Sequence, residues 1–192
     1  MPADFTEVLE FWFGAPDSPD LGRSRREWFE KNPAFDAEIL ARFLDTYEAA
    51  AAGRLAMWER TPLASLALIV VLDQFPRNMF RRTARAFAAD KIALDASRRA
   101  FDNGFDSLLR PVERLFLFLP FEHSEDLAAQ RRSLRLFAAL AEESGAVDNH
   151  DYARRHYDII ARFGRFPHRN AVLGRESTAP ELEFLKQPGS SF

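Results

Sequence analysis

Apolar residues recur at the spacing of an α-helix along most of this chain. One series repeats every four residues and ends before Gly53, and another repeats every seven residues and ends before Gly104. The first series is Phe35, Ile39, Phe43 and Tyr47, and the second is Phe87, Leu94 and Phe101. Both spacings are typical of amphipathic helices. No stretch alternates apolar and polar residues as a strand does, so the pattern predicts an all-α fold.

Helix boundaries can also be placed from the sequence. Pro33, Pro62 and Pro111 stand where first-turn prolines belong, and Asp4 with Glu7 resembles a capping box. The predicted helices, about eight or nine, cover residues 4–13, 23–30, 33–52, 62–75, 84–103, 111–119, 124–143, 149–163 and 179–186. Short connections predict antiparallel helical hairpins. No linker divides them, so we expect one all-α domain over residues 1–186 and a flexible tail over residues 187–192.

Composition and charge narrow the class of protein. The 192 residues are 47% hydrophobic and include 19 Phe, which suits one domain with a large core. The net charge of -3 argues against a nucleic-acid partner, because binding to phosphate backbones normally needs a clustered basic surface. Among the basic residues 23 are Arg and three are Lys, and Arg is suited to planar, bidentate recognition of anions.

Cysteine usage and hydropathy point to a compartment. No cysteine is present, which excludes disulfides, thiolate nucleophiles and cysteine-ligated metals. The longest aliphatic run, residues 63–72, is about half the roughly 20 residues needed to span a bilayer. The first residues show no secretory signal pattern. We therefore expect a soluble, cytoplasmic protein with no membrane partner.

Polar residues interrupt several of the predicted core faces. On helix 62–75 the stripe Leu63, Leu66, Val70 continues onto Asp73 and Gln74. Asp90, Gln130 and His156 similarly lie within the apolar stripes of helices 84–103, 124–143 and 149–163. An ionised carboxylate in an apolar interior needs donors, and Arg77 and Arg81 are near in sequence. Two interpretations stay open: a closed Arg-Asp network that joins helices, or a pocket whose polar lining meets a ligand.

A Phe-Pro step that leads into Arg-Asn occurs twice. Residues 75–78 read FPRN and residues 166–170 read FPHRN. Because proline disfavours helical geometry at the residue before it, each step predicts a rigid helix exit that aims the following polar side chains. These side chains are Arg77 and Asn78 at the first exit and His168, Arg169 and Asn170 at the second. We expect the two exits to converge, so that Arg77 and Arg169 flank one polar pocket.

The stretch FLPFEHSEDLAAQ, residues 118–130, adds a candidate acid-base group. It predicts a break at Pro120, an N-cap at Ser124 and first-turn acids at Glu125 and Asp126, where acids complement the helix dipole. His123 precedes this cap and could work with His156 near neutral pH, although a lone histidine is more often simply packed. No metal-binding spacing, phosphate loop, dinucleotide motif or nucleophile elbow is present, so we expect neither metal nor cofactor.

Several stretches together resemble a known family. VLEFWFG, LALIVVLDQFPRNMFR, FLPFEHSED and FGRFPHRNAVLGRES are similar to the domain of unknown function 924 family, and the likeness covers nearly the whole chain. The resemblance implies an all-α fold like tetratricopeptide-repeat superhelices, but no reaction, substrate or partner. Members usually carry a glycine after the position of Arg81, where this chain has Arg82, and another near residues 63–65.

Three hypotheses for function follow from these residues. The first is a ligand-binding module for an anionic small molecule or peptide terminus. Its site would comprise Asp73, Gln74, Arg77, Asn78, Arg81, His123, Gln130, His168, Arg169 and Asn170. The second is a metal-independent hydrolase or acid-base enzyme that uses His123 or His156 with Asp73 or Asp90. The third is a structural Arg-Asp network alone.

Overall fold

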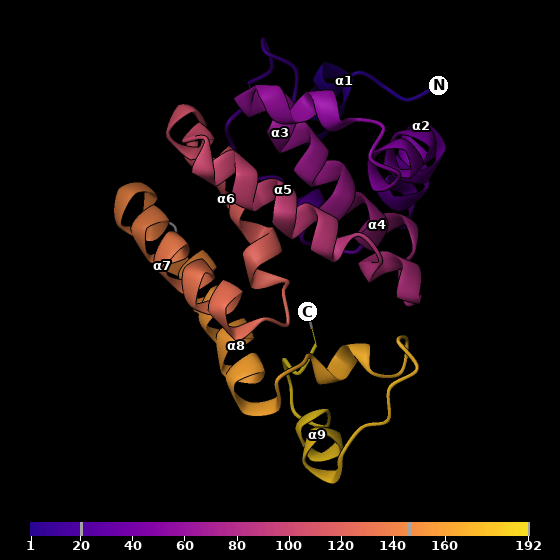
Figure 1. The fold of residues 1–192 in the computed structure, drawn as a ribbon, viewed down its shortest axis with the longest axis vertical. Coiled ribbons are helices and arrows are strands. Elements are labelled where there is room, and N and C mark those ends of the chain that lie inside the picture. Colours follow the sequence, from indigo (N-terminus) through magenta and orange to yellow (C-terminus); the bar gives the residue numbers. More distant parts are fainter. Residues whose placement is uncertain (20, 146, 192) are drawn as a thin grey trace. The chain divides into compact units, whose positions relative to one another are not determined.

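The structure is a computed structural model that describes residues 1–19, 21–145 and 147–191, and the described residues form helices and no strand (Figure 1). The α-helices are α1 (Phe5–Phe13), α2 (Pro33–Ala51), α3 (Pro62–Ile69), α4 (Phe75–Met79), α5 (Asp90–Asp102), α6 (Pro111–Glu122), α7 (Leu127–Ser144), α8 (Val147–Phe163) and α9 (Ala179–Phe184). Short 3₁₀ helices are η1 (Arg26–Trp28), η2 (Ala56–Arg60), η4 (Ala84–Phe87), η5 (Phe105–Leu108) and η6 (Pro167–Arg169), and η3 (Val70–Gln74) is a π-helix. The all-α prediction is confirmed.

The chain divides into two compact units. The first unit comprises residues 1–81 and 85–120, and the second comprises residues 82–84 and 121–192. The boundary falls inside α6, directly after Pro120. The expected domain over residues 1–186 and the flexible tail remain predictions. Within the tail Ser190 is buried and its hydroxyl donates to the Leu185 carbonyl, while Phe192 lies outside the described residues.

The first unit is built around α3. Every residue from Ala64 to Pro76 is buried, so this helix is covered on all sides rather than along one stripe. That explains why its sequence is apolar nearly throughout. Leu63, the expected start of the core stripe, is 46% exposed, because it lies on the first turn before the surrounding elements close over the helix. Trp12, Phe75 and other aromatic rings pack edge to face in this core.

The segment 62–79 corrects the expected helix exit at Phe75. The chain passes from α3 through the π-helical turn η3 directly into α4, and Phe75 has helical backbone angles of φ -57° and ψ -43°. Pro76 occupies the first turn of α4, where its missing N–H costs least. Arg77 and Asn78 therefore lie on a helix rather than in an exit loop.

The second unit is built on the hairpin of α7 and α8, which pack along each other. Its core contains Ile159, Ile160 and Phe166, with Leu127 and Phe163 packed against them. Both helices are amphipathic, as the sequence pattern predicts. Phe166 is fully buried and extended, with φ -86° and ψ 107°, so here the Phe-Pro step does interrupt the helix.

Only some of the predicted helix starts and caps are present in the structure. Pro33, Pro62 and Pro111 do begin their helices. Asp4 is the N-cap of α1 but its side chain makes no capping hydrogen bond, and Glu7 instead lies 3.5 Å from Arg42. The break expected at Pro120 is also absent, because α6 continues to Glu122.

The cap expected at Ser124 is two residues too early. Asp126 is the N-cap of α7 and its Oδ1 accepts from the Ala129 amide, whereas the Ser124 hydroxyl accepts from the Asp126 amide. A serine two residues before the cap thus shapes the turn that leads into the helix.

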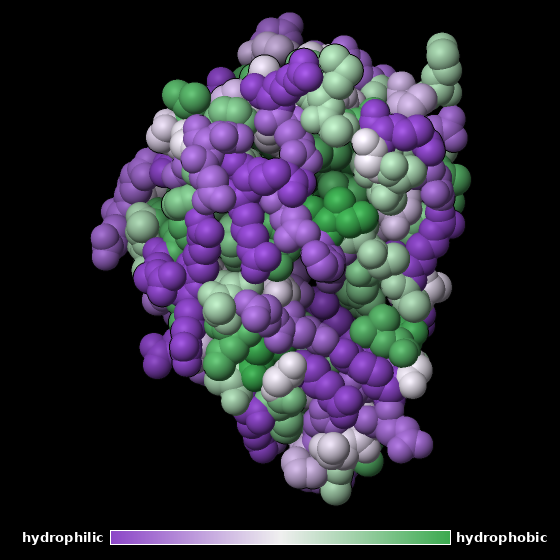
Figure 2. Space-filling model, in the orientation of Figure 1, coloured by the Kyte–Doolittle hydropathy of each residue, from purple (hydrophilic) through white to green (hydrophobic). Residues whose placement is uncertain are grey.

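The surface carries scattered apolar residues. On the face drawn in Figure 2 they lie among hydrophilic ones. Phe29, Met57 and Leu108 are the most exposed large apolar side chains after Met1, at 61%, 70% and 70%. Isolated exposure of this kind is normal for folded proteins. Among the described residues, the length and hydropathy of every helix fall short of what a bilayer crossing requires.

Candidate functional site

The predicted site residues fall into two groups, one in each unit. The first unit holds Asp73, Gln74, Arg77, Asn78, Arg81 and Asp90, and the second holds His123, Gln130, His156, His168, Arg169 and Asn170. The convergence of Arg77 and Arg169 on one pocket therefore joins residues of different units and stays a prediction. Each group is described separately.

In the first unit Arg77 joins two carboxylates. Its Nη1 and Nη2 donate to Oδ1 and Oδ2 of Asp90 over 2.9 and 3.1 Å, a bidentate pair. Nη1 also donates to the Asp73 carbonyl over 2.6 Å and lies 3.4 Å from Asp73 Oδ1. Burial works against the charge of Arg77, but Asp73 and Asp90 raise its pKa above the ordinary value. The guanidinium is fixed in this position by α4, η3 and α5.

The neighbouring polar residues of the first unit are also bound to each other. Gln74 donates its Nε2 to Asp73 Oδ2 over 2.6 Å, which places a second donor on that buried carboxylate. Asn78 and Arg81 both donate to Asp36 in the first turn of α2, and Arg81 does so with two nitrogens over 2.5 and 2.9 Å. Asp36 is not among the residues predicted from the sequence, because an acid in the first turn of a helix is ordinarily explained by the helix dipole.

These contacts have the form of a closed Arg-Asp network that joins helices, which is one of the two interpretations of the sequence. Asp73 is 1% exposed and receives Gln74 and Arg77, so its charge is compensated inside the fold. Arg77 keeps 19% of its side chain exposed, and its planar fork is occupied by Asp90. A guanidinium held bidentately by a carboxylate must give up that pair before it can bind another anion.

In the second unit the central contact joins a carboxylate and an imidazole. Glu122 Oε1 lies 3.2 Å from His156 Nδ1, and both side chains are 5% exposed. The same Nδ1 lies 2.9 Å from the Tyr152 carbonyl oxygen, which can only accept. Nδ1 is therefore assigned the proton, and Nε2 the lone pair. A carboxylate that orients an imidazole in this way is the arrangement found beside general bases.

The charge state of His156 follows from its surroundings. Burial, together with the basic groups of His123, Arg169 and His168, lowers the pKa of His156 to about 3, and the Tyr152 carbonyl opposes them. The carboxylate of Glu122 at 3.2 Å also favours a charged ring. Because burial is the largest influence, we describe His156 as neutral at neutral pH.

Basic groups gather around the ring of Phe166. Arg169 lies over this ring at 4.4 Å, and the rings of His156 and His168 lie 5.5 and 5.6 Å from it. The His123 ring lies 6.2 Å from that of His156. We call these four basic side chains together with Glu122 the histidine cluster. Three segments supply it: the end of α6 with the residue after it, α8, and η6.

Gln130 holds the α6 end of the histidine cluster. Its Nε2 donates to the carbonyls of Glu122 and Ser124 over 2.6 and 2.7 Å, which fixes the amide orientation. Its Oε1 is buried and has no hydrogen-bond partner among the residues described. A buried amide oxygen in this condition is a place where a water or ligand donor would bind.

The turn with the sequence FPHRN is stabilised by an ion pair and a backbone hydrogen bond at Glu125. Glu125 accepts two bonds from Arg175 over 2.7 and 2.9 Å and one from the Phe166 amide. Although burial opposes it, the pKa of Glu125 is lowered by Arg175 and this amide. Asn170 donates to Ser177 over 3.0 Å and is 1% exposed, so it faces the loop before α9. Glu125 thus supports the turn rather than capping α7.

Glu122 is the functional candidate that sequence reasoning missed. It directly precedes His123 in PFEHSED, but its side chain had no predicted partner, because its contact with His156 spans more than thirty residues of chain. The hypothesis that Asp73 or Asp90 orients a histidine stays untested. Both contact Arg77, and the carboxylate described beside His156 is Glu122.

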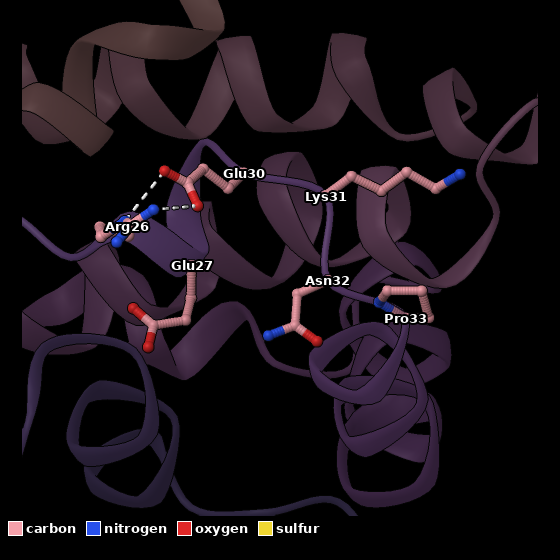
Figure 3. Close-up of a pocket in the computed structure, with 6 residues that line it drawn as sticks. All are labelled: Arg26, Glu27, Glu30, Lys31, Asn32 and Pro33. Carbon is pink, nitrogen blue, oxygen red and sulfur yellow. Dashed lines mark hydrogen bonds and ion pairs between the residues drawn. The ribbon is translucent and has the colours of Figure 1, made fainter.

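Two adjoining open depressions lie on the first unit, away from the predicted residues. One is lined by Arg26, Glu27, Glu30, Lys31, Asn32 and Pro33 (Figure 3). Arg26 pairs with Glu30 there, and Asn32 Oδ1 accepts from the amides of Ala34 and Phe35 at the start of α2. Arg26, Glu30 and Asn32 are therefore already held by hydrogen bonds within the fold.

The residues described hold no group of three or more His, Asp or Glu that could bind a metal ion. In the histidine cluster Glu122 and His156 are in contact, whereas His168 lies beside Phe166 and His123 beside the His156 ring. Zinc sites need ligands that converge on one point at about 2 Å. Imidazole and guanidinium groups such as these can transfer protons and bind anions.

Comparison with known proteins gives the family but no activity. A protein of unknown function, ATU0120 from Agrobacterium tumefaciens, has a similar solved structure at 40% sequence identity, with a TM-score of 0.82 and coverage of 95% of this chain and 96% of that one. Among curated proteins there is no match. The model of a family described as bacterial proteins of unknown function, DUF924, matches residues 8–189. The chain therefore belongs to the DUF924 family.

Proposed function

We propose that this protein is a ligand-binding module for an anionic small molecule or peptide terminus, and that the histidine cluster of the second unit is its binding site. The single observation that carries the proposal is the gathering of Arg169, His156 and His168 around Phe166, with His123 beside His156. Burial lowers the pKa of His156 most, and His123, Arg169 and His168 lower it as well. An anion placed among them would relieve that repulsion.

The contacts favour Arg169 as a ligand-binding residue over Arg77, Asn78 and Arg81, whereas the sequence alone did not distinguish them. Arg169 is 6% exposed and stacked, which preorganises a planar fork of donors for a carboxylate or phosphate. Arg77, Asn78 and Arg81 are held by Asp90 and Asp36, which favours a structural role for them. We extend the proposal to a cytoplasmic protein, as the cysteine-free sequence allows. The family resemblance adds a tetratricopeptide-repeat-like scaffold of helical hairpins to the proposal.

Thermal melting in the presence of anions tests this function. An anion that binds the folded state raises the melting temperature by mass action. We expect phosphate, sulfate or small carboxylates to give a saturable rise in the parent protein, and expect Arg169→Ala to abolish it. Arg155→Ala is the matched control, because Arg155 lies over Tyr152 on exposed α8 surface. Absence of any saturable rise in the parent protein would refute the proposal.

One observation favours a second candidate, an acid-base enzyme without a metal. His156 donates from Nδ1 to Tyr152 beside the Glu122 carboxylate, so Nε2 is the basic nitrogen. A screen of ester, phosphate and amide substrates, with His156→Gln as the inactive variant, tests this candidate. Turnover that survives His156→Gln would exclude His156 as the base, and His123 would be the next residue to replace.

A further inference from the structure

Two buried polar groups on α7 have no hydrogen-bond partner in the part of the chain that the structure describes. They are the amide oxygen of Gln130 and the hydroxyl of Ser133, and both residues are 0% exposed. A polar group buried without a partner destabilises a folded protein, so such groups are normally satisfied by an ordered water molecule. The two groups therefore point to a bound molecule inside the second unit.

The orientation of the Gln130 amide leaves its oxygen in need of a donor. Nε2 donates to the carbonyls of Glu122 and Ser124 over 2.6 and 2.7 Å. Carbonyl oxygens can only accept, so a rotated amide would place Oε1 against two other acceptors. Oε1 therefore faces away from both carbonyls, and the group that satisfies it must donate.

The hydroxyl of Ser133 lacks the bond that a helical serine commonly makes. A serine within a helix can donate to the carbonyl four residues earlier, as Ser144 does to Leu140 over 2.6 Å in the same helix. Ser133 makes no such bond with Ala129. Its hydroxyl is therefore available to donate to a bound molecule or to accept from one.

The spacing of the two residues suits one small bridging molecule. Residues three apart on a helix share a face, and their Cβ atoms are about 5 to 6 Å apart. Two successive hydrogen bonds of about 2.8 Å span the same distance. The bridging molecule must donate to Gln130, pair with the hydroxyl of Ser133 and fit where no solvent reaches. Water meets these conditions, since it is small and can both donate and accept.

We propose that the second unit contains an internal hydration site on the buried face of α7, in which one ordered water molecule joins Gln130 Oε1 to Ser133 Oγ. The water donates to Oε1 and accepts from the hydroxyl. It thereby holds the Gln130 amide, which fixes the carbonyls of Glu122 and Ser124 on either side of His123. The water thus supports the α6 end of the histidine cluster, independently of any anion.

A high-resolution crystal structure of the parent protein tests for the water directly. We expect one peak of solvent density within about 3.2 Å of both Gln130 Oε1 and Ser133 Oγ. The absence of density in contact with both atoms would overturn the proposal. Density for a molecule larger than water at this place would overturn it as well.

A matched pair of serine variants tests the bridge in solution. Ser97 is also 0% exposed and its hydroxyl has no partner, but no other buried side-chain atom of α5, which is described throughout, lacks one. Both replacements by alanine favour the helix, and Ser97→Ala removes an unsatisfied hydroxyl, so its melting temperature should be unchanged or raised. Ser133→Ala takes one partner from the water, so its melting temperature should be about 2 to 4 °C below that of Ser97→Ala.

The melting temperatures decide between a bridged and an unsatisfied hydroxyl at Ser133. Circular dichroism first shows that each variant is folded. A melting temperature of Ser133→Ala equal to or above that of Ser97→Ala would contradict the water bridge, because both hydroxyls would then be unsatisfied in the same way. Neither the crystal structure nor the melting comparison depends on anion binding, so failure of the proposed ligand-binding function leaves both results standing.

Discussion

The two Phe-Pro steps show how one short sequence can have different structural outcomes. Phe75 and Pro76 lie inside a continuous helical run, where a π-helical turn precedes them and Arg77 is held by two carboxylates. Phe166 and Pro167 leave the helix, with Phe166 extended and a 3₁₀ turn following. In the first case the arginine completes a closed ion network. In the second it stacks on the phenylalanine within a cluster of histidines.

The difference arises from the partners that each fold supplies. Around Arg77 the first unit provides Asp73 and Asp90, so the charges balance locally. Around Arg169 the second unit provides the ring of Phe166, and Arg169 also helps to lower the pKa of Glu125, which Arg175 holds. Two carboxylates thus bind the first arginine, whereas an aromatic ring packs against the second. The sequence motif alone therefore does not define the role of its arginine.

The largest expected effect is on the closed network. Arg77→Ala removes the guanidinium that contacts both Asp90 and Asp73, which is 1% exposed, so we expect a loss of about 3 to 5 kcal/mol in unfolding free energy. Chemical denaturation followed by circular dichroism measures it. Arg81→Ala is the control and should cost about 1 kcal/mol or less, because Arg81 is 37% exposed. Equal losses in the two variants would contradict a special role for Arg77.

The next effect is a pH dependence that belongs to His156. Its pKa is about 3 in the folded protein and about 6.5 when unfolded, so below pH 6.5 the unfolded chain binds the proton and the folded protein does not. Stability should therefore fall as the pH drops from 6.5 towards 3, by up to about 1.4 kcal/mol for each pH unit.

His156→Gln should flatten this slope between pH 6.5 and 5, above the range where carboxylates titrate. Denaturation midpoints at closely spaced pH values measure the slope. If Glu122 instead keeps the folded ring protonated, the sign reverses and stability rises as the pH falls through 6.5. That result would mean that the ion pair outweighs burial at this site.

A further acid-dependent loss should come from Glu181. Arg165 lowers the pKa of Glu181 to about 2, against the opposing effect of burial and with help from Thr178. Arg165 donates to both carboxylate oxygens over 2.6 and 2.8 Å. The stabilisation is complete above about pH 4.5 and should disappear as the pH falls towards 2. The stability of Glu181→Gln, measured by denaturation at decreasing pH, should not show this loss between about pH 4.5 and 2. If the variant and the parent protein lose stability equally, the pair of Arg165 and Glu181 does not contribute to stability.

The smallest expected effect concerns the backbone just after the first Phe-Pro step. Arg82 has φ +63°, and a residue with a side chain loses about 1 kcal/mol of folded-state stability in this left-handed region. Glycine avoids that strain, but it also makes the unfolded chain more flexible, which favours unfolding. Arg82→Gly should therefore leave the melting temperature unchanged or slightly raised. Gly145→Ala, at φ +74° after α7, should lower stability by about 1 kcal/mol. A clear loss in Arg82→Gly would indicate that its side chain contributes more than the strain costs.

Local patterns were sufficient for most of the helices, but not for two of them. The predicted helix 23–30 is only the short 3₁₀ helix η1, and the predicted helix 84–103 is divided into η4 and α5. The stretches 33–52, 111–119 and 149–163 agree with α2, α6 and α8 to within a few residues, because apolar spacing and first-turn prolines act over one or two turns. The pattern also identified Asp73, Asp90 and His156 as polar groups on inward faces. It could not show that α3 is buried on every side, since that depends on elements far away in the chain.

The sequence by itself determined that this protein is all-α, where most of its helices begin, and which polar residues need partners. Only the tertiary structure decided the partners: Asp36 for Asn78 and Arg81, Glu122 for His156, and Arg175 for Glu125. It also decided that one Phe-Pro step stays helical. Helix formation depends on neighbours within a few residues, whereas the pairing of buried charges depends on which distant segments the packing brings within about 3 Å.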